Sequence, residues 1–148
     1  MPTDLNEAAT IAQLLATCRR VAVVGLSPKP HRESYGVARA MQDAGWRIIP
    51  INPAAAGSTI LGERVYATLT EAAAHETIDL VNVFRNADDV PPVVDEAIAI
   101  HAPAIWLQLG IRHDGAADRA RAAGLAVVQD KCLKVEWRLR AANHATLP

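Results

Sequence analysis

The chain has 148 residues, about the length of one domain, and its 15 basic and 16 acidic residues give a formal charge of −1. This balance excludes a protein that holds nucleic acid or an acidic membrane surface through its overall field. An apolar content of 51% is typical of a folded globular domain, and no apolar run reaches the ~20 residues that a membrane-spanning helix needs. Two isolated cysteines and a start unlike a signal peptide predict a cytoplasmic protein without a disulfide framework.

Short apolar runs alternate with amphipathic segments along most of the chain. The runs predict five buried strands, at 21–24, 47–51, 80–84, 104–108 and 125–128. The segments between and around them predict helices over about 5–18, 35–44, 70–74, 88–101, 114–123 and 131–141. We expect Asp4 or Asn6, Thr70 and Asp88 to cap three of these helices, and His101 to lie on a buried helix face.

This alternation predicts an α/β fold, a three-layer Rossmann-like doubly wound parallel sheet of about five strands. We expect one domain over 1–148 with its core at about 21–138, because no linker or repeat divides the chain. A ligand of such a sheet lies beyond the carboxyl ends of the strands. The segments that reach this edge are 25–34, 52–53, 84–85, 108–110 and 129–132.

The loop after the first strand is rich in groups that bind phosphate. Hydroxyl and cationic side chains follow Gly25 closely, and the loop leads into the start of a helix; these side chains are Ser27, Lys29, His31, Arg32 and Ser34. The loop has one glycine in place of G-x-G-x-x-G, and the second strand ends in Asn52 where an NAD site needs an acidic residue. A P-loop motif is also missing. The loop therefore favours a phosphate-bearing nucleotide over a standard NAD cofactor.

Several motifs in order resemble the small stand-alone CoA-binding proteins of bacteria, which share the fold of the N-terminal domain of the succinyl-CoA synthetase alpha subunit. The motifs lie at 23–30, 34–38, 51–53, 60–62, 79–85, 106–110 and 130–134, so the resemblance spans about 21–138. It implies CoA or an acyl-CoA in an extended form across the carboxyl edge of the sheet. The implied ligand-binding residues are Gly25, Leu26, Ser27, Lys29, Arg32, Ser34, Tyr35, Asn52, Pro53, Val83, Phe84, Arg85, Gln108, Leu109 and Gly110.

The resemblance also implies what the protein does with the ligand. The phosphorylated histidine of the synthetase belongs to a second domain that this chain lacks, so we expect CoA binding without catalysis, no catalytic residue and no metal. Asn52 and Pro53 lie roughly where the synthetase carries a lysine, which makes Lys29 and Arg32 the candidates for the 3′-phosphate. We expect no nucleic acid or membrane partner, and the sequence leaves open a homo-oligomer or a protein partner.

Two other functions fit the same residues. One is a small oxidoreductase that binds NAD(P) at a variant Rossmann site. The other is a redox module in which Cys132 forms a mixed disulfide with the CoA thiol, because Lys131 and Lys134 lie beside it and favour a thiolate.

Overall fold

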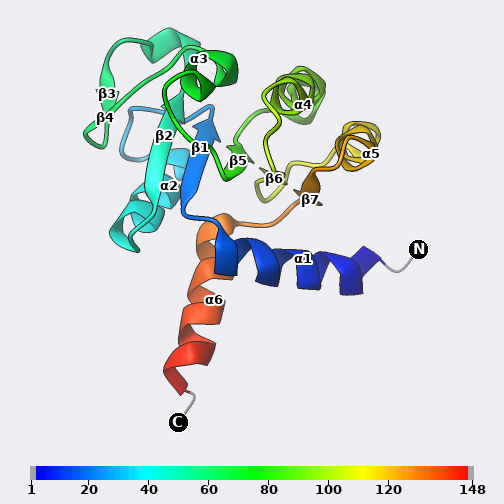
Figure 1. The fold of residues 1–148 in the computed structure, drawn as a ribbon. Helices are drawn as coiled ribbons and strands as arrows, with labels where there is room; N and C mark the ends of the chain where they lie inside the picture. Colours follow the sequence, from blue (N-terminus) through cyan, green and yellow to red (C-terminus); the bar gives the residue numbers. More distant parts are fainter. Residues whose placement is uncertain (1–2, 147–148) are drawn as a thin grey trace.

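The computed structural model describes residues 3–146, and the side chains of 7–141. At its centre lies a five-stranded sheet in the order β2-β1-β5-β6-β7, and every pairing in it is parallel. The strands are β1 (Arg20–Val24), β2 (Arg47–Ile51), β5 (Leu80–Val83), β6 (Ala104–Leu107) and β7 (Ala126–Val128). Each begins and ends within one residue of its prediction, and the predicted α/β fold is confirmed (Figure 1).

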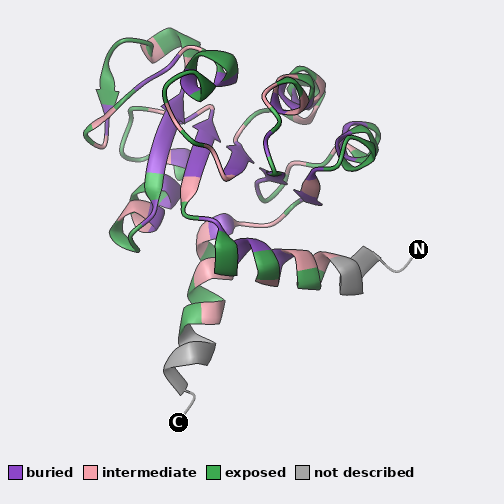
Figure 2. Ribbon diagram, viewed as in Figure 1, coloured by how far each residue is buried: buried purple, intermediate pink, exposed green. Residues whose placement is uncertain are grey.

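Helices cover both faces of the sheet and complete three layers. One face packs on α1 (Thr3–Thr17), α2 (Glu33–Asp43) and α6 (Leu133–Thr146), and the other on α3 (Leu69–Ala73), α4 (Val90–Ala99) and α5 (Asp114–Ala122). The strands between these layers are almost wholly buried (Figure 2). This explains why their sequences are continuous apolar runs and do not alternate. None of the described helices is both long and apolar enough to cross a membrane.

The segment between β2 and α3 has more order than its sequence suggests. It contains the short 3₁₀-helix η1 (Pro53–Ala55) and a hairpin of β3 (Thr59–Ile60) and β4 (Glu63–Arg64). A second 3₁₀-helix, η2 (Ala87–Asp89), precedes α4. The five strands predicted from the sequence do not include this hairpin.

The predicted cap of α3 is wrong by two residues. Thr68 caps this helix, because its hydroxyl accepts a hydrogen bond from the backbone N–H of Glu71 at 3.1 Å. Thr70 lies inside the helix, where its backbone N–H and its hydroxyl donate to the Glu96 carboxylate of α4 at 3.0 and 2.9 Å. Thr70 thus links two helices and does not begin one.

The predicted cap of α4 is also wrong. Asp88 lies in η2, and Asp89 occupies the N-cap position without a side-chain cap bond. Pro91 and Pro92 follow in the first turn of the helix. Because proline has no backbone N–H, this helix start has fewer unpaired donors and less need for a capping side chain.

Three smaller corrections concern helix ends. α1 is already helical at Thr3, so neither Asp4 nor Asn6 is its cap. α2 begins at Glu33, before the predicted start, and α6 continues to Thr146. His101 is exposed, and its φ of +58° ends α4 in the left-handed conformation, so its side chain does not join the core.

The amino-terminal edge of the sheet carries an ion-pair network. The Glu76 carboxylate accepts hydrogen bonds from Arg20 at 3.0 Å, from Arg47 at 2.9 Å and from the Tyr66 hydroxyl at 3.1 Å. The bond from Arg47 is the main cause that lowers the pKa of Glu76 below its usual value. This network ties β1 and β2 to the end of α3 at the edge opposite the carboxyl ends of the strands.

Candidate functional site

The site lies at the carboxyl edge of the sheet, where the strand order reverses between β1 and β5. Gly25 follows β1 there, with a φ of +88°, and its N–H donates to the Ile51 carbonyl at 2.9 Å. A Cβ at this position would lie 2.4 Å from the carbonyl oxygen of Phe84. Only glycine therefore allows the loops after β1 and β5 to approach so closely.

Polar side chains hold the loop after Gly25 in one shape. The buried Ser34 hydroxyl accepts a hydrogen bond from the Ser27 backbone N–H at 3.0 Å, and the Ser27 hydroxyl accepts one from the Lys29 N–H at 3.1 Å. The Asn52 amide donates to the Leu26 carbonyl at 2.9 Å and ties the loop to the end of β2. These residues shape the loop before any ligand arrives.

The first of two cavities at this edge opens at the start of α2, and we call it the α2 cavity. Its volume is about 410 Å³, and it is lined by Gly25, Ser27, Lys29, Arg32, Glu33, Ser34 and Phe84. Lys29 and Arg32 are exposed cations beside the positive end of a helix dipole, a setting that favours an anion. The sequence predicted all of these residues except Glu33, because a carboxylate is not expected beside a phosphate.

The second cavity lies between the end of β2 and the starts of α3 and α4, and we call it the α4 cavity. Its volume is about 330 Å³, and its walls are Val24, Ile51, Pro53, Ala67, Thr68, Arg85, Asp89, Pro92, Val93 and Glu96. Aliphatic and proline side chains form most of this lining, with polar groups among them, as is typical of sites for a nucleobase or another apolar moiety. Of its residues the sequence predicted Pro53 and Arg85.

Phe84 and Arg85 connect the two cavities. These neighbours follow β5, and Phe84 lines the α2 cavity while Arg85 lines the α4 cavity. Both residues pack close to Gly25, as the distances from its ideal Cβ show: 2.4 Å to the Phe84 oxygen and 3.4 Å to Cδ of Arg85. One extended ligand could therefore contact both cavities across this point.

Other predicted site residues line neither cavity. Leu26 and Val83 are fully buried in the core, and Tyr35 is half-buried against the core between the sheet and α2. The Asn52 side chain holds the loop as described. Three of these residues thus belong to or pack on the core, and Asn52 fixes the loop.

The segment 108–110 contributes one buried and two exposed residues. Gln108 is 1% exposed, its side-chain oxygen accepts a hydrogen bond from the Leu133 N–H at 3.3 Å, and its amide donates to Glu33 at 3.5 Å. Leu109 is exposed, and the Gly110 N–H donates to Asp130 at 2.7 Å. Gln108 thus satisfies polar groups beneath the α2 cavity, and any ligand contact here falls to the exposed residues.

The thiol chemistry considered from the sequence is not assembled at these cavities. Cys132 is half-buried against the core beside α6 and lines neither cavity. Within residues 3–146, no group of three histidine, cysteine or acidic residues is placed to hold a metal ion.

Comparisons with known proteins identify the family and the fold. The family model described as the CoA binding domain matches residues 19–138. The uncharacterized protein YneT of Bacillus subtilis (strain 168) is 40% identical over 127 residues, which cover 86% of this chain and 91% of YneT. The structure of cell-free ID.343 from Thermus thermophilus is 31% identical with a TM-score of 0.83, over 88% of this chain and 96% of that one.

A more distant structure shares the fold alone. RSP, a Rex-family repressor solved in complex with β-NADH, has a TM-score of 0.55 at 17% identity. The match covers 97% of this chain and 70% of RSP.

Proposed function

Because the chain belongs to the family of CoA-binding domains, we propose that it binds CoA or an acyl-CoA at the carboxyl edge of its sheet and catalyses no reaction by itself. The observation that carries this proposal is the pair of cavities, one cationic at a helix start and one mainly apolar, whose linings are linked by the neighbours Phe84 and Arg85. CoA has the matching chemistry, since charged phosphates join its pantetheine arm to an adenosine whose flat base suits a mainly apolar cavity.

In this proposal the α2 cavity takes the phosphates. The helix start and the backbone N–H groups of the loop supply donors, and Lys29 and Arg32 supply positive charge. Glu33 is not a phosphate ligand, because like charges repel. Its carboxylate accepts a hydrogen bond from Gln108 and is available to the amide N–H groups of the pantetheine arm.

The α4 cavity would then take the adenosine, between Ile51 and Pro53 on one side and Pro92 and Val93 on the other. Arg85 is the cation in this lining, which makes it a better candidate for the 3′-phosphate than Lys29 or Arg32 in the neighbouring cavity. The pantetheine arm would run past Phe84 toward the exposed rim at Leu109 and Gly110.

The lining supports a binding role more than a catalytic one. Ser27 and Ser34 of the lining already accept hydrogen bonds that hold the loop, and no histidine lies among the described lining residues to activate them as nucleophiles. The ligand would be held as a carrier, a sensor or a partner subunit holds it.

Isothermal titration calorimetry with CoA, dephospho-CoA and NADH tests the proposal. We expect CoA to bind more tightly than dephospho-CoA, and Arg85→Ala to remove most of that preference, because a charged hydrogen bond to phosphate contributes about 1.5–3 kcal/mol. Arg112→Ala, a change at an exposed arginine that lines neither cavity, is the matched control.

The outcomes test the identity of the ligand separately from the residue that binds its 3′-phosphate. Heat from NADH and none from CoA at millimolar concentration would overturn the proposal and favour the oxidoreductase. Tight CoA binding with an unchanged phosphate preference in Arg85→Ala would reject only the role of Arg85 and leave Lys29 and Arg32 as the partners of the 3′-phosphate.

A further inference from the structure

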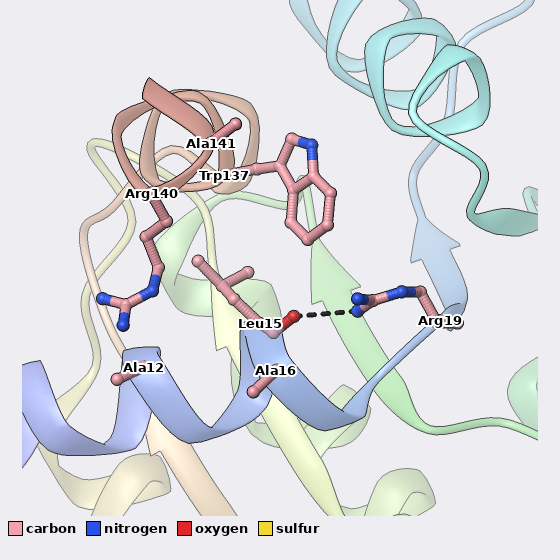
Figure 3. A pocket seen from close by; sticks show the side chains of 7 residues that line it. All are labelled: Ala12, Leu15, Ala16, Arg19, Trp137, Arg140 and Ala141. Carbon is pink, nitrogen blue, oxygen red and sulfur yellow. Dashed lines mark hydrogen bonds between the residues drawn. The ribbon is translucent and has the colours of Figure 1, made fainter. Parts of the chain in front are cut away.

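A cavity larger than either of the two above lies between α1 and α6, away from the carboxyl edge of the sheet. Its volume is about 690 Å³, and we call it the α1–α6 groove. Its lining is Ala12, Leu15, Ala16, Arg19, Trp137, Arg140 and Ala141, none of which lines the α2 or α4 cavity (Figure 3). The groove is therefore separate from the proposed CoA site.

The floor of the groove is apolar and packs on the core. Leu15 is 3% exposed, and the half-buried Trp137 ring packs edge-on against Trp46 with 5.6 Å between the ring centres. Small side chains on both helices leave room for another backbone to come close; they are Ala12, Ala16 and Ala141.

Two arginines flank this floor without a carboxylate partner. The Arg19 guanidinium lies 5.0 Å from the centre of the Trp137 ring and donates to the Leu15 carbonyl at 2.8 Å. Within the described part of the chain, neither Arg19 nor Arg140 forms an ion pair. Figure 3 shows the two guanidinium groups at opposite ends of the groove, with Leu15 and Trp137 between them.

The shape of the groove favours a protein segment over a small molecule. A small-molecule site encloses most of its ligand, whereas all the lining residues of this groove come from α1, the residue Arg19 just after it, and α6. A helix that lay along the groove would cover the open side between α1 and α6. Its apolar face would meet Leu15 and Trp137, and its carboxylates would neutralise the two arginines.

We propose that the α1–α6 groove docks an acidic amphipathic helix of a partner protein. Apolar side chains of that helix pack on Leu15 and Trp137, and acidic side chains at its two ends pair with Arg19 and Arg140. The two sites share no residue, so the partner helix and CoA can be bound at the same time.

The probe is a fluorescein-labelled synthetic helix of leucine, alanine and glutamate, with glutamates spaced two turns apart beside a leucine stripe. Its binding is measured by fluorescence anisotropy at low salt. We expect Arg140→Glu to weaken binding about tenfold or more, since a charge that attracted the helix now repels it. The matched control, Arg138→Glu, makes the same change at an exposed position of α6 that does not line the groove, and we expect less than a twofold effect.

Three results would overturn the proposal. One is no binding of the acidic helix, or equal binding of a version with lysine for glutamate. A second is equal loss in Arg140→Glu and Arg138→Glu, which would show attraction to α6 as a whole. The third is a dimer in sedimentation that Arg140→Glu dissociates, since a second copy of the chain would then cover the groove. Circular dichroism of each variant establishes that it is folded.

Discussion

Replacement of Gly25 by alanine tests the close approach on which the candidate site depends. The new Cβ would lie 2.4 Å from the backbone oxygen of Phe84, and neither atom is at the end of a flexible side chain that could move away. The φ of +88° adds a conformational cost of about 1 kcal/mol for a residue with a Cβ. Forced separation of the two loops adds about 1–3 kcal/mol, as overpacking does elsewhere. We expect a total loss of about 2–4 kcal/mol in the free energy of unfolding.

Gly124→Ala is the matched control for this change. Gly124 has a φ of +95°, but no atom lies within 4 Å of its ideal Cβ, so this variant bears the conformational cost alone. Urea denaturation of both variants isolates the effect of the collision with Phe84. Equal destabilisation of the two would show that the loops after β1 and β5 do not meet as described, and the reasoning about the site would fail.

Three further predictions concern single side chains. Ser34→Ala leaves the Ser27 N–H without its acceptor, so we expect about 1 kcal/mol less stability in urea and weaker CoA binding by calorimetry; unchanged affinity would show that loop shape does not matter. Thr68→Ala should cost about 1 kcal/mol in urea through loss of the α3 cap, and a neutral result would refute that assignment. The folded pKa of Glu76 lies below its unfolded value, mainly through Arg47, so its contribution to stability is present above the unfolded pKa and is lost as pH falls through the folded pKa. Thermal melts at falling pH should show this loss, which is at most about 1 kcal/mol because Arg47 is 42% exposed. Glu76→Gln should reduce the dependence of the melting temperature on pH, and an equal dependence in both proteins would contradict the prediction.

The fold could be predicted because its sheet is parallel and covered on both faces. Each strand is then a short apolar run, such as Val21 to Val24, between charged or turn-forming residues, and little else produces that pattern. The residues at which helices begin were harder to predict than the strands. Thr68 and Thr70 are equally good caps by residue type, but only Thr68 has a glutamate three residues later, the capping-box pattern, and our sequence prediction missed this signal.

The two cavities differ in how much of them the sequence reveals. All but one of the residues of the α2 cavity come from the single segment 25–34, so local motifs were enough to predict them, with the exception of Glu33. The α4 cavity combines residues such as Ile51, Thr68 and Pro92, which lie far apart in sequence and meet only because the crossovers bring three elements to one edge. No local signal marks such a surface.

Gln108 shows a distinction that a sequence does not make. A polar residue at the end of a buried strand is typical of a ligand contact, but here the amide is itself buried and binds the N–H of Leu133 and the carboxylate of Glu33. A sequence does not distinguish a side chain that meets a ligand from one that satisfies buried polar groups beneath it.

Native mass spectrometry of the protein with added CoA or NADH tests the central claim most directly. We predict one bound CoA per chain in wild-type protein and in Gly124→Ala, and little or none in Gly25→Ala under conditions where circular dichroism shows it folded. A complex with NADH but not with CoA, or equal CoA occupancy in both glycine variants, would contradict the account of this edge as a CoA site.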